Sequence, residues 1–209
     1  IGTLDIMTNG KAIFGCGVGY RDVEFKAFGT SRKVRGKRFE ENLTTIKRLW
    51  TEDTVTIKGS HFELDDASCS AKPVQQPHPP IWIGASADAA IQRAAQMGTC
   101  WYVGPNDRLD AVADQLETYK RALDDADKPF PEEFPFRREV FVAPTREEAF
   151  RIAKGPIMQK YQAYHAWGLG RSRPGETDEL GQPFEDLMKD RFFIGSPDDV
   201  AEQIIKFNK

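Results

Sequence analysis

Four small residues follow a short apolar segment near the middle of the chain, in a pattern typical of an anion-binding turn. Ile81, Trp82 and Ile83 form the apolar segment, which has the β-branched and aromatic composition of a buried strand. Residues 84–87 are all small, so the backbone can approach a ligand, and an alanine-rich helix follows. The first amides of such a helix point at the strand's end and favour a phosphate there. An ordinary strand-to-helix connection without a ligand explains the same residues equally well.

Two residues set the predicted limits of that helix. Ser86 is the expected N-cap, because its hydroxyl can accept a hydrogen bond from an amide of the first turn. Gly98 follows the last alanine-rich turn and is the expected C-terminal stop. The turn does not match a glycine-rich phosphate motif.

Three glycines alternate with other residues in a short apolar segment near the N-terminus, at positions 15, 17 and 19. Alternating glycines weaken a lone strand, so we expect something to lie close to it. Two explanations stay open, namely tight packing of this strand against a helix and a bound ligand. Tyr20 and Arg21 follow directly and would sit at the carboxyl end of the strand.

The cysteines and histidines have neither the spacing of a metal site nor the look of a disulfide framework. The three cysteines are Cys16, Cys69 and Cys100, and the three histidines are His61, His78 and His165. Scattered cysteines in odd number are typical of free thiols in a reducing compartment. We predict a cytoplasmic protein without a metal site.

The composition excludes two classes of partner. The chain has 209 residues and a net charge of −3, which implies no general attraction to nucleic acid or to an anionic membrane. No apolar run approaches the roughly 20 residues of a membrane-spanning helix.

Periodicity and turn residues predict the elements around these candidates. Residues 34–51 carry an apolar stripe at helical spacing, and residues 54–64 read as a β-hairpin that turns at Gly59. Further strands are expected at 99–103 and 139–143, and further helices at 107–126, from Thr145, at 156–167 and from Pro197. The expected N-caps of three of these helices are Asp107, Thr145 and Ser196.

Residues 168–183 are polar and contain four glycines and two prolines, which predicts a mobile loop. Arg171 and Arg173 would suit a lid that closes over a site. A flexible insertion without such a role is the equal alternative.

Strand–helix units repeat along the chain and predict an α/β fold with a parallel sheet. Four units do not close a barrel, whereas eight do, usually in about 250 residues. The chain starts at Ile1 and ends on a helical pattern without a cap. We therefore expect residues 1–209 to form a single domain that is a truncated (β/α)8 barrel of the TIM type.

Several short stretches, in a consistent order and spacing over nearly the whole chain, carry a family resemblance. They are residues 14–20, 38–41, 49–51, 58–59, 61–62, 72–75, 77–84, 94–95 with Gly98, and 194–197. On these residues the chain resembles the luciferase-like monooxygenase family, the flavin-dependent enzymes of the bacterial luciferase and alkanesulfonate monooxygenase type. The resemblance implies a TIM-type barrel, of which this chain would hold about the fourth to seventh strands with their helices.

The resemblance also implies a place for the cofactor, at the carboxyl ends of the strands with its phosphate near the turn after the fifth strand. The implied cofactor-binding residues are Gly84, Ala85, Ser86, Ala87, Trp101, Tyr102 and Gly104. Tyr20 and Arg21 would face the substrate pocket. The resemblance names no catalytic residue in this part of the fold.

The activity implied by the resemblance is that of a monooxygenase that uses reduced FMN and O2 to oxidise a small organic substrate. A separate flavin reductase and a homodimer are expected with it. Two alternatives remain: an F420-dependent hydride-transfer oxidoreductase of the same superfamily, and a flavin-binding relative without catalysis.

Overall fold

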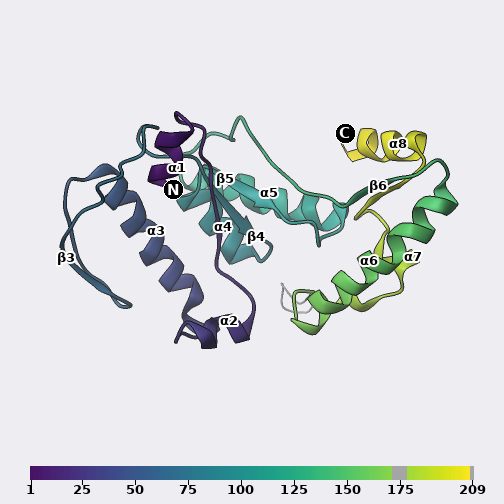
Figure 1. Ribbon diagram of the computed structural model, residues 1–209, viewed down its shortest axis with the longest axis horizontal. Coiled ribbons are helices and arrows are strands. Elements are labelled where there is room, and N and C mark those ends of the chain that lie inside the picture. The colour runs from purple at the N-terminus through teal and green to yellow at the C-terminus, as the bar shows by residue number, and fades with distance from the viewer. Residues whose placement is uncertain (171–177, 208–209) are drawn as a thin grey trace.

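The computed structural model describes residues 1–170 and 178–207 and arranges them in two lobes joined by an extended segment (Figure 1). The first lobe holds helices α1 to α5, and the second holds α6 to α8. Two short elements of the first lobe, α1 (Gly2–Met7) and α2 (Asp22–Ala27), stand before and after the first strand. A short 3-10 helix, η1 (Arg32–Val34), then leads into the long helix α3.

The first lobe is built on a three-stranded parallel sheet in the order β1-β4-β5. Its strands are β1 (Phe14–Gly17), β4 (Ile81–Ala85) and β5 (Cys100–Val103). The prediction of a parallel α/β sheet is therefore confirmed.

The second lobe contains two more parallel strands, β6 (Val140–Val142) and β7 (Phe193–Gly195). A parallel bridge links Val103 of β5 to Phe136, in the segment that precedes β6. The described residues therefore hold five parallel strands in these sheets, and the prediction of four was low by one. The strand that the prediction missed is β7, which at three residues is too short to show a hydrophobic periodicity in the sequence. In the structure Ile194 of β7 is fully buried beside β6.

Three helices of the first lobe form a hydrophobic core with one face of the sheet. They are α3 (Arg35–Thr51), α4 (Asp88–Met97) and α5 (Leu109–Asp125). The core between sheet and helices includes Leu43, Ile81, Ile83, Ile91, Trp101, Val103 and Tyr119. The predicted helix at 34–51 is confirmed within one residue.

The second lobe is packed by α6 (Arg146–Ala166), α7 (Phe184–Leu187) and α8 (Pro197–Phe207). The prediction of separate helices on either side of Pro156 was wrong, because α6 runs through this proline. Four side chains spaced by four residues keep α6 continuous against the core, which offsets the proline's missing hydrogen bond. They are Ala149, Ala153, Ile157 and Tyr161.

Two of the predicted N-caps in these helices are confirmed. Thr145 Oγ1 accepts a hydrogen bond from the Glu148 amide at 3.2 Å, and Ser196 Oγ accepts one from the Asp199 amide at 3.2 Å. Asp107 was wrongly predicted as the cap of α5, since that role falls to the next residue.

The predicted hairpin is confirmed as the antiparallel pair β2 (Val55–Lys58) and β3 (Glu63–Ala67). Its second strand extends three residues beyond the predicted end at 64. The Gly59 amide donates to the Phe62 carbonyl oxygen across the turn.

The predicted loop at 168–183 falls partly on residues 171–177, and these, with Arg171 and Arg173, lie outside the described residues. Beyond them the chain forms a short 3-10 helix, η2 (Glu179–Gly181). Leu180 in it is 2% exposed and belongs to the core of the second lobe. This end of the predicted loop is therefore packed against the second lobe.

Candidate functional site

The carboxyl ends of the three parallel strands of the first lobe lie side by side. Gly17 of β1 pairs in register with Gly84 of β4, and Gly84 pairs with Tyr102 of β5. Ligands of open α/β sheets bind outside this end of the strands. The register therefore brings three of the sequence-predicted regions together in one place.

The glycines of β1 lie on the sheet face that is turned away from the helices. A Cβ atom added to Gly15 would meet no atom within 4 Å, and one added to Gly17 would meet only the Gly84 carbonyl oxygen, at 3.6 Å. Phe14 and Cys16, between them in sequence, pack on the helix side. Tight packing against a helix therefore does not explain these glycines, and they leave an open surface.

Two aromatic rings lie beside this open surface, both on the side of β4 and β5. The rings of Trp82 and Tyr102 stack with 6.1 Å between their centroids and an interplanar angle of 14°. Both side chains are half-buried, whereas Ile81 and Ile83 on the opposite face of β4 are buried in the core. Bare glycine backbone beside stacked aromatic rings can accept a planar ring system.

The turn after β4 differs from the prediction at Ser86. Helix α4 begins at Asp88 with Ala87 as its N-cap residue, and no side chain caps it. The Ser86 hydroxyl is therefore not the predicted cap, because the helix starts one residue later than expected. Asp88 adds a carboxylate to the first turn of this helix.

Trp101 supports this turn from the core instead of facing the open surface. Its side chain is fully buried, and the indole Nε1 donates a 2.8 Å hydrogen bond to the Ala85 carbonyl oxygen. Its neighbour Tyr102 points to the other face of the sheet, because side chains alternate along a strand. Of this predicted pair, only the Tyr102 side chain borders the open surface.

A second side chain that the sequence reasoning missed also holds the turn. Gln115 of α5 is 2% exposed, and its Nε2 donates to the Ser86 carbonyl oxygen at 3.1 Å and to Asp107 Oδ2 at 3.0 Å. A buried glutamine on an otherwise apolar helix face was the available sequence signal. The backbone of residues 85–86 is thus fixed by two buried donors.

Arg138 lies beside the predicted residue Gly104, and sequence reasoning missed it as well. Its Nη1 donates to the Gly104 carbonyl oxygen at 2.8 Å, while its Nε and Nη2 are buried without a hydrogen-bond partner. Burial lowers the pKa of this guanidinium, and the charges of Asp107 and Glu139 act against that shift. The sequence signal was a charged run directly before the apolar strand β6. A largely buried cation with free donors at a strand end can bind an anion.

Tyr20 and Arg21 lie at the end of β1, but they contact the second lobe. The Arg21 guanidinium carbon is 4.4 Å from the ring centroid of Trp167, and the Tyr20 ring is 6.2 Å from it. Burial, with Tyr164 and Glu24 as lesser causes, raises the pKa of Tyr20. The predicted pocket residues therefore sit where the end of α6 meets the first lobe.

Two thiols, those of the half-buried Cys16 and the buried Cys100, are held in their protonated form. Burial raises the pKa of Cys16 and of Cys100 to about 11, so neither is a ready nucleophile. Among residues 1–170 and 178–207, no group of three or more His, Cys, Asp or Glu side chains could hold a metal ion. No helix within the same ranges is long and apolar enough to cross a membrane.

Comparison with known proteins gives one family model, described as luciferase-like monooxygenase, that matches residues 1–209. The chain is 28% identical to an FMNH(2)-dependent dimethylsulfone monooxygenase of Pseudomonas putida, covering 98% of this chain and 60% of that protein. It is 24% identical to an F420-dependent glucose-6-phosphate dehydrogenase of Amycolatopsis mediterranei (strain U-32), covering 97% of this chain and 62% of that protein.

A solved structure shares the fold. It is the oxygenating constituent of 3,6-diketocamphane monooxygenase from a plasmid of Pseudomonas putida, in complex with FMN, with a TM-score of 0.79 and 20% identity. The match covers 99% of this chain and 63% of that one. The chain thus spans about three fifths of the length of the proteins that it matches.

Proposed function

Since the chain belongs to the luciferase-like monooxygenase family, we propose that it forms the cofactor-binding part of an enzyme that uses reduced FMN and O2 to oxidise a small organic substrate. The observation that carries the proposal is the open glycine surface at the carboxyl ends of β1 and β4, with the stacked pair Trp82 and Tyr102 beside it.

The isoalloxazine ring fits this surface, because glycine backbone lets a planar ring approach the sheet closely. Gly15 and Gly17 leave this space on β1, and Gly104 leaves it after β5, where an added Cβ would meet no atom within 4 Å. The rings of Trp82 and Tyr102 would flank the cofactor and keep water from one side of it.

The phosphate would lie at the turn of residues 84–87, on backbone amides and the Ser86 hydroxyl. We propose Arg138 as the cation that balances the phosphate charge. Its two unpartnered nitrogens are the available donors near Gly104. Trp101 and Gln115 act as positioning residues, since their hydrogen bonds hold the backbone carbonyls of this turn.

Reduced FMN would supply the electrons and the reaction with O2. The residues of this chain bind and orient the cofactor and exclude water, and a separate flavin reductase would supply it in reduced form. The organic substrate would approach from the side of Tyr20 and Arg21. We further propose a homodimer, which size-exclusion chromatography with light scattering would test.

Hydride transfer with F420 is the second candidate function. It is favoured by the similarity to the F420-dependent dehydrogenase of Amycolatopsis mediterranei. The same open surface would accept either ring system.

Fluorescence titration of the purified chain with FMN and with F420 tests both candidates. We expect FMN to bind and Ser86→Asp to weaken that binding at least about tenfold, because a carboxylate would repel the phosphate at short range. Ser70→Asp, an exposed serine in the segment before β4, is the matched control. Binding of F420 alone would move the function to hydride transfer, and equal FMN affinity of both variants and wild type would contradict the placement of the phosphate.

A further inference from the structure

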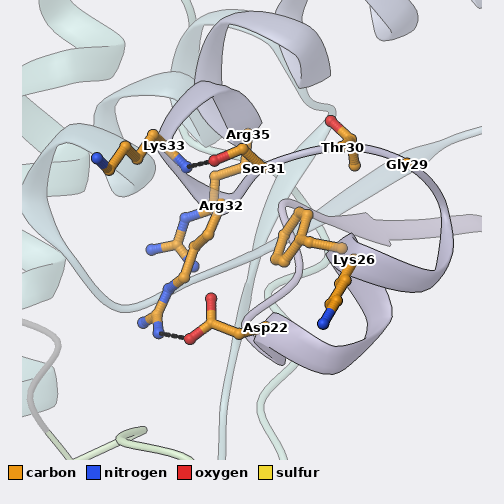
Figure 2. A pocket seen from close by; sticks show the side chains of 9 residues that line it. Asp22, Lys26, Gly29, Thr30, Ser31, Arg32, Lys33 and Arg35 are labelled. Carbon is orange, nitrogen blue, oxygen red and sulfur yellow. Dashed lines mark hydrogen bonds and ion pairs between the residues drawn. The ribbon is translucent and has the colours of Figure 1, made fainter.

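A cationic pocket lies between α2 and α3, beside the site described above (Figure 2). It is a cavity of about 830 Å³ in an open surface. Four of its lining residues are basic, namely Lys26, Arg32, Lys33 and Arg35, and one, Asp22, is acidic. The other lining residues include the hydroxyl-bearing Thr30 and Ser31. Four cations against one carboxylate leave an excess of three positive charges.

Neighbouring acids do not cancel this excess. Asp22 Oδ2 is 3.7 Å from Arg32 Nη1, and the Asp22 side chain is 77% exposed. Glu24 of α2 is paired with Arg21 at 2.9 Å, outside the pocket lining. Screening by water leaves such exposed pairs weak, so the pocket keeps its positive character.

Arg32 and Arg35 hold their charges close together, and Figure 2 shows their side chains next to one another. Arg35 is anchored, because its Nη1 donates to the Gly19 carbonyl oxygen at 2.7 Å. Burial lowers the pKa of Arg35, the charges of Arg32 and Arg93 add to this shift, and the Asp22 carboxylate acts against it. Like charges gathered around a cavity destabilise one another unless an anion enters it.

The position of the pocket connects it to the strand ends. Gly19, which holds Arg35, directly precedes Tyr20 and Arg21, and α2 begins at the following residue. A ligand at the carboxyl end of β1 could therefore extend an anionic group into the pocket.

We propose that this pocket binds a multiply charged anionic group, of the phosphate or polycarboxylate class, at the outer end of a ligand. Arg32 supplies the forked donor pair that matches such oxygens, and Lys26 and Lys33 are the two lysines of the lining, whose side chains point to opposite sides in Figure 2. Anion binding here does not depend on which cofactor occupies the strand ends.

The test is isothermal titration of the 209-residue chain with inorganic pyrophosphate at low salt. We expect wild type to bind and Arg32→Gln to bind at least about tenfold more weakly, because a charge-assisted contact is lost. Lys37→Gln removes the same charge from an exposed position on α3 outside the pocket lining, and should change affinity less than about twofold. Absence of binding by wild type, or an equal loss in both variants, would overturn the proposal.

Titrations with F420 and FMN then identify the source of the anion. F420 carries several carboxylates on its side chain, whereas FMN ends in one phosphate. If Arg32→Gln bound F420 more weakly than wild type but bound FMN equally well, the pocket would be the site that holds the side chain of F420. Unchanged binding of both cofactors, with pyrophosphate binding still lost, would assign it to an anionic substrate. The FMN titration of wild type tests the flavin proposal independently of pyrophosphate binding, so a failure of either proposal can be told from a failure of the other. Circular dichroism checks that both variants fold.

Discussion

The indole Nε1 of Trp101 donates a 2.8 Å hydrogen bond to the carbonyl oxygen of Ala85, which ties the core of β5 to the candidate phosphate turn at the end of β4. The same indole packs against Tyr119 of α5, so Trp101 connects the helix α5, the strand β5 and the turn after β4.

Trp101→Phe should destabilise the chain by about 1–3 kcal/mol, because the substitution leaves the Ala85 carbonyl without its donor and removes buried ring area. It should also weaken FMN binding, since the turn loses one of its two side-chain supports. Urea unfolding followed by circular dichroism measures the first effect, and fluorescence titration measures the second. Trp82→Phe, on the open face, is the control and should cost less stability; an equal loss in both would contradict the role given to the hydrogen bond.

Two serines that look alike in sequence should differ in their effect on stability. Ser196 Oγ accepts from the Asp199 amide, so Ser196→Ala should cost about 1 kcal/mol of helix-capping energy. The Ser86 hydroxyl caps no helix, so Ser86→Ala should change the free energy of unfolding by less than about 0.5 kcal/mol. Thermal unfolding of both variants makes the comparison, and a larger loss for Ser86→Ala would show that the cap had been placed at the wrong residue.

Two glycines should likewise respond in opposite ways to alanine. Gly98→Ala would place its Cβ 2.7 Å from the Ala94 carbonyl oxygen, so we expect a loss of about 1–3 kcal/mol. Gly15→Ala meets open space and should leave stability nearly unchanged, while its methyl group should weaken FMN binding on the open face. Chemical unfolding and FMN titration of both variants test this. Unaltered FMN affinity in Gly15→Ala would argue against a cofactor on that face.

The buried carboxylate of Asp5 should make stability depend on pH. Burial by itself raises the pKa of Asp5, but hydrogen bonds from Gln75, Ala12 and Val74 outweigh it and lower the pKa below its usual value. The Val74 and Gln75 amides donate at 2.8 and 2.9 Å. A carboxyl pKa that is lower in the folded than in the unfolded state stabilises the fold. This stabilisation is complete above the pKa of the unfolded state, about 3.9, and is lost as the pH falls through the pKa of the folded state.

Urea midpoints measured between pH 7 and pH 2 should therefore fall at the acid end in wild type. Asp5→Asn should be less stable at pH 7 and should lose less on acidification. Asp114→Asn, on the exposed surface of α5, is the control and should keep the wild-type profile. If the urea midpoint of Asp5→Asn fell with pH as steeply as that of wild type, the acid sensitivity would belong to other groups.

Much of the local structure could be predicted from the sequence. The stripe of α3, the hairpin and the caps Thr145 and Ser196 were all found, because each depends on side chains only a few residues apart. The turn of residues 84–87 was placed correctly for the same reason, although its cap was misplaced by one residue.

The remainder was decided by tertiary structure. Strand register determined that the glycines of β1 face open space and that Tyr102, not Trp101, borders it. Chain segments far apart in sequence brought Arg138 to Gly104 and Arg35 to Gly19. A sequence pattern records the spacing of neighbours along one element, whereas these contacts depend on how whole elements pack, so only the folded chain could reveal them.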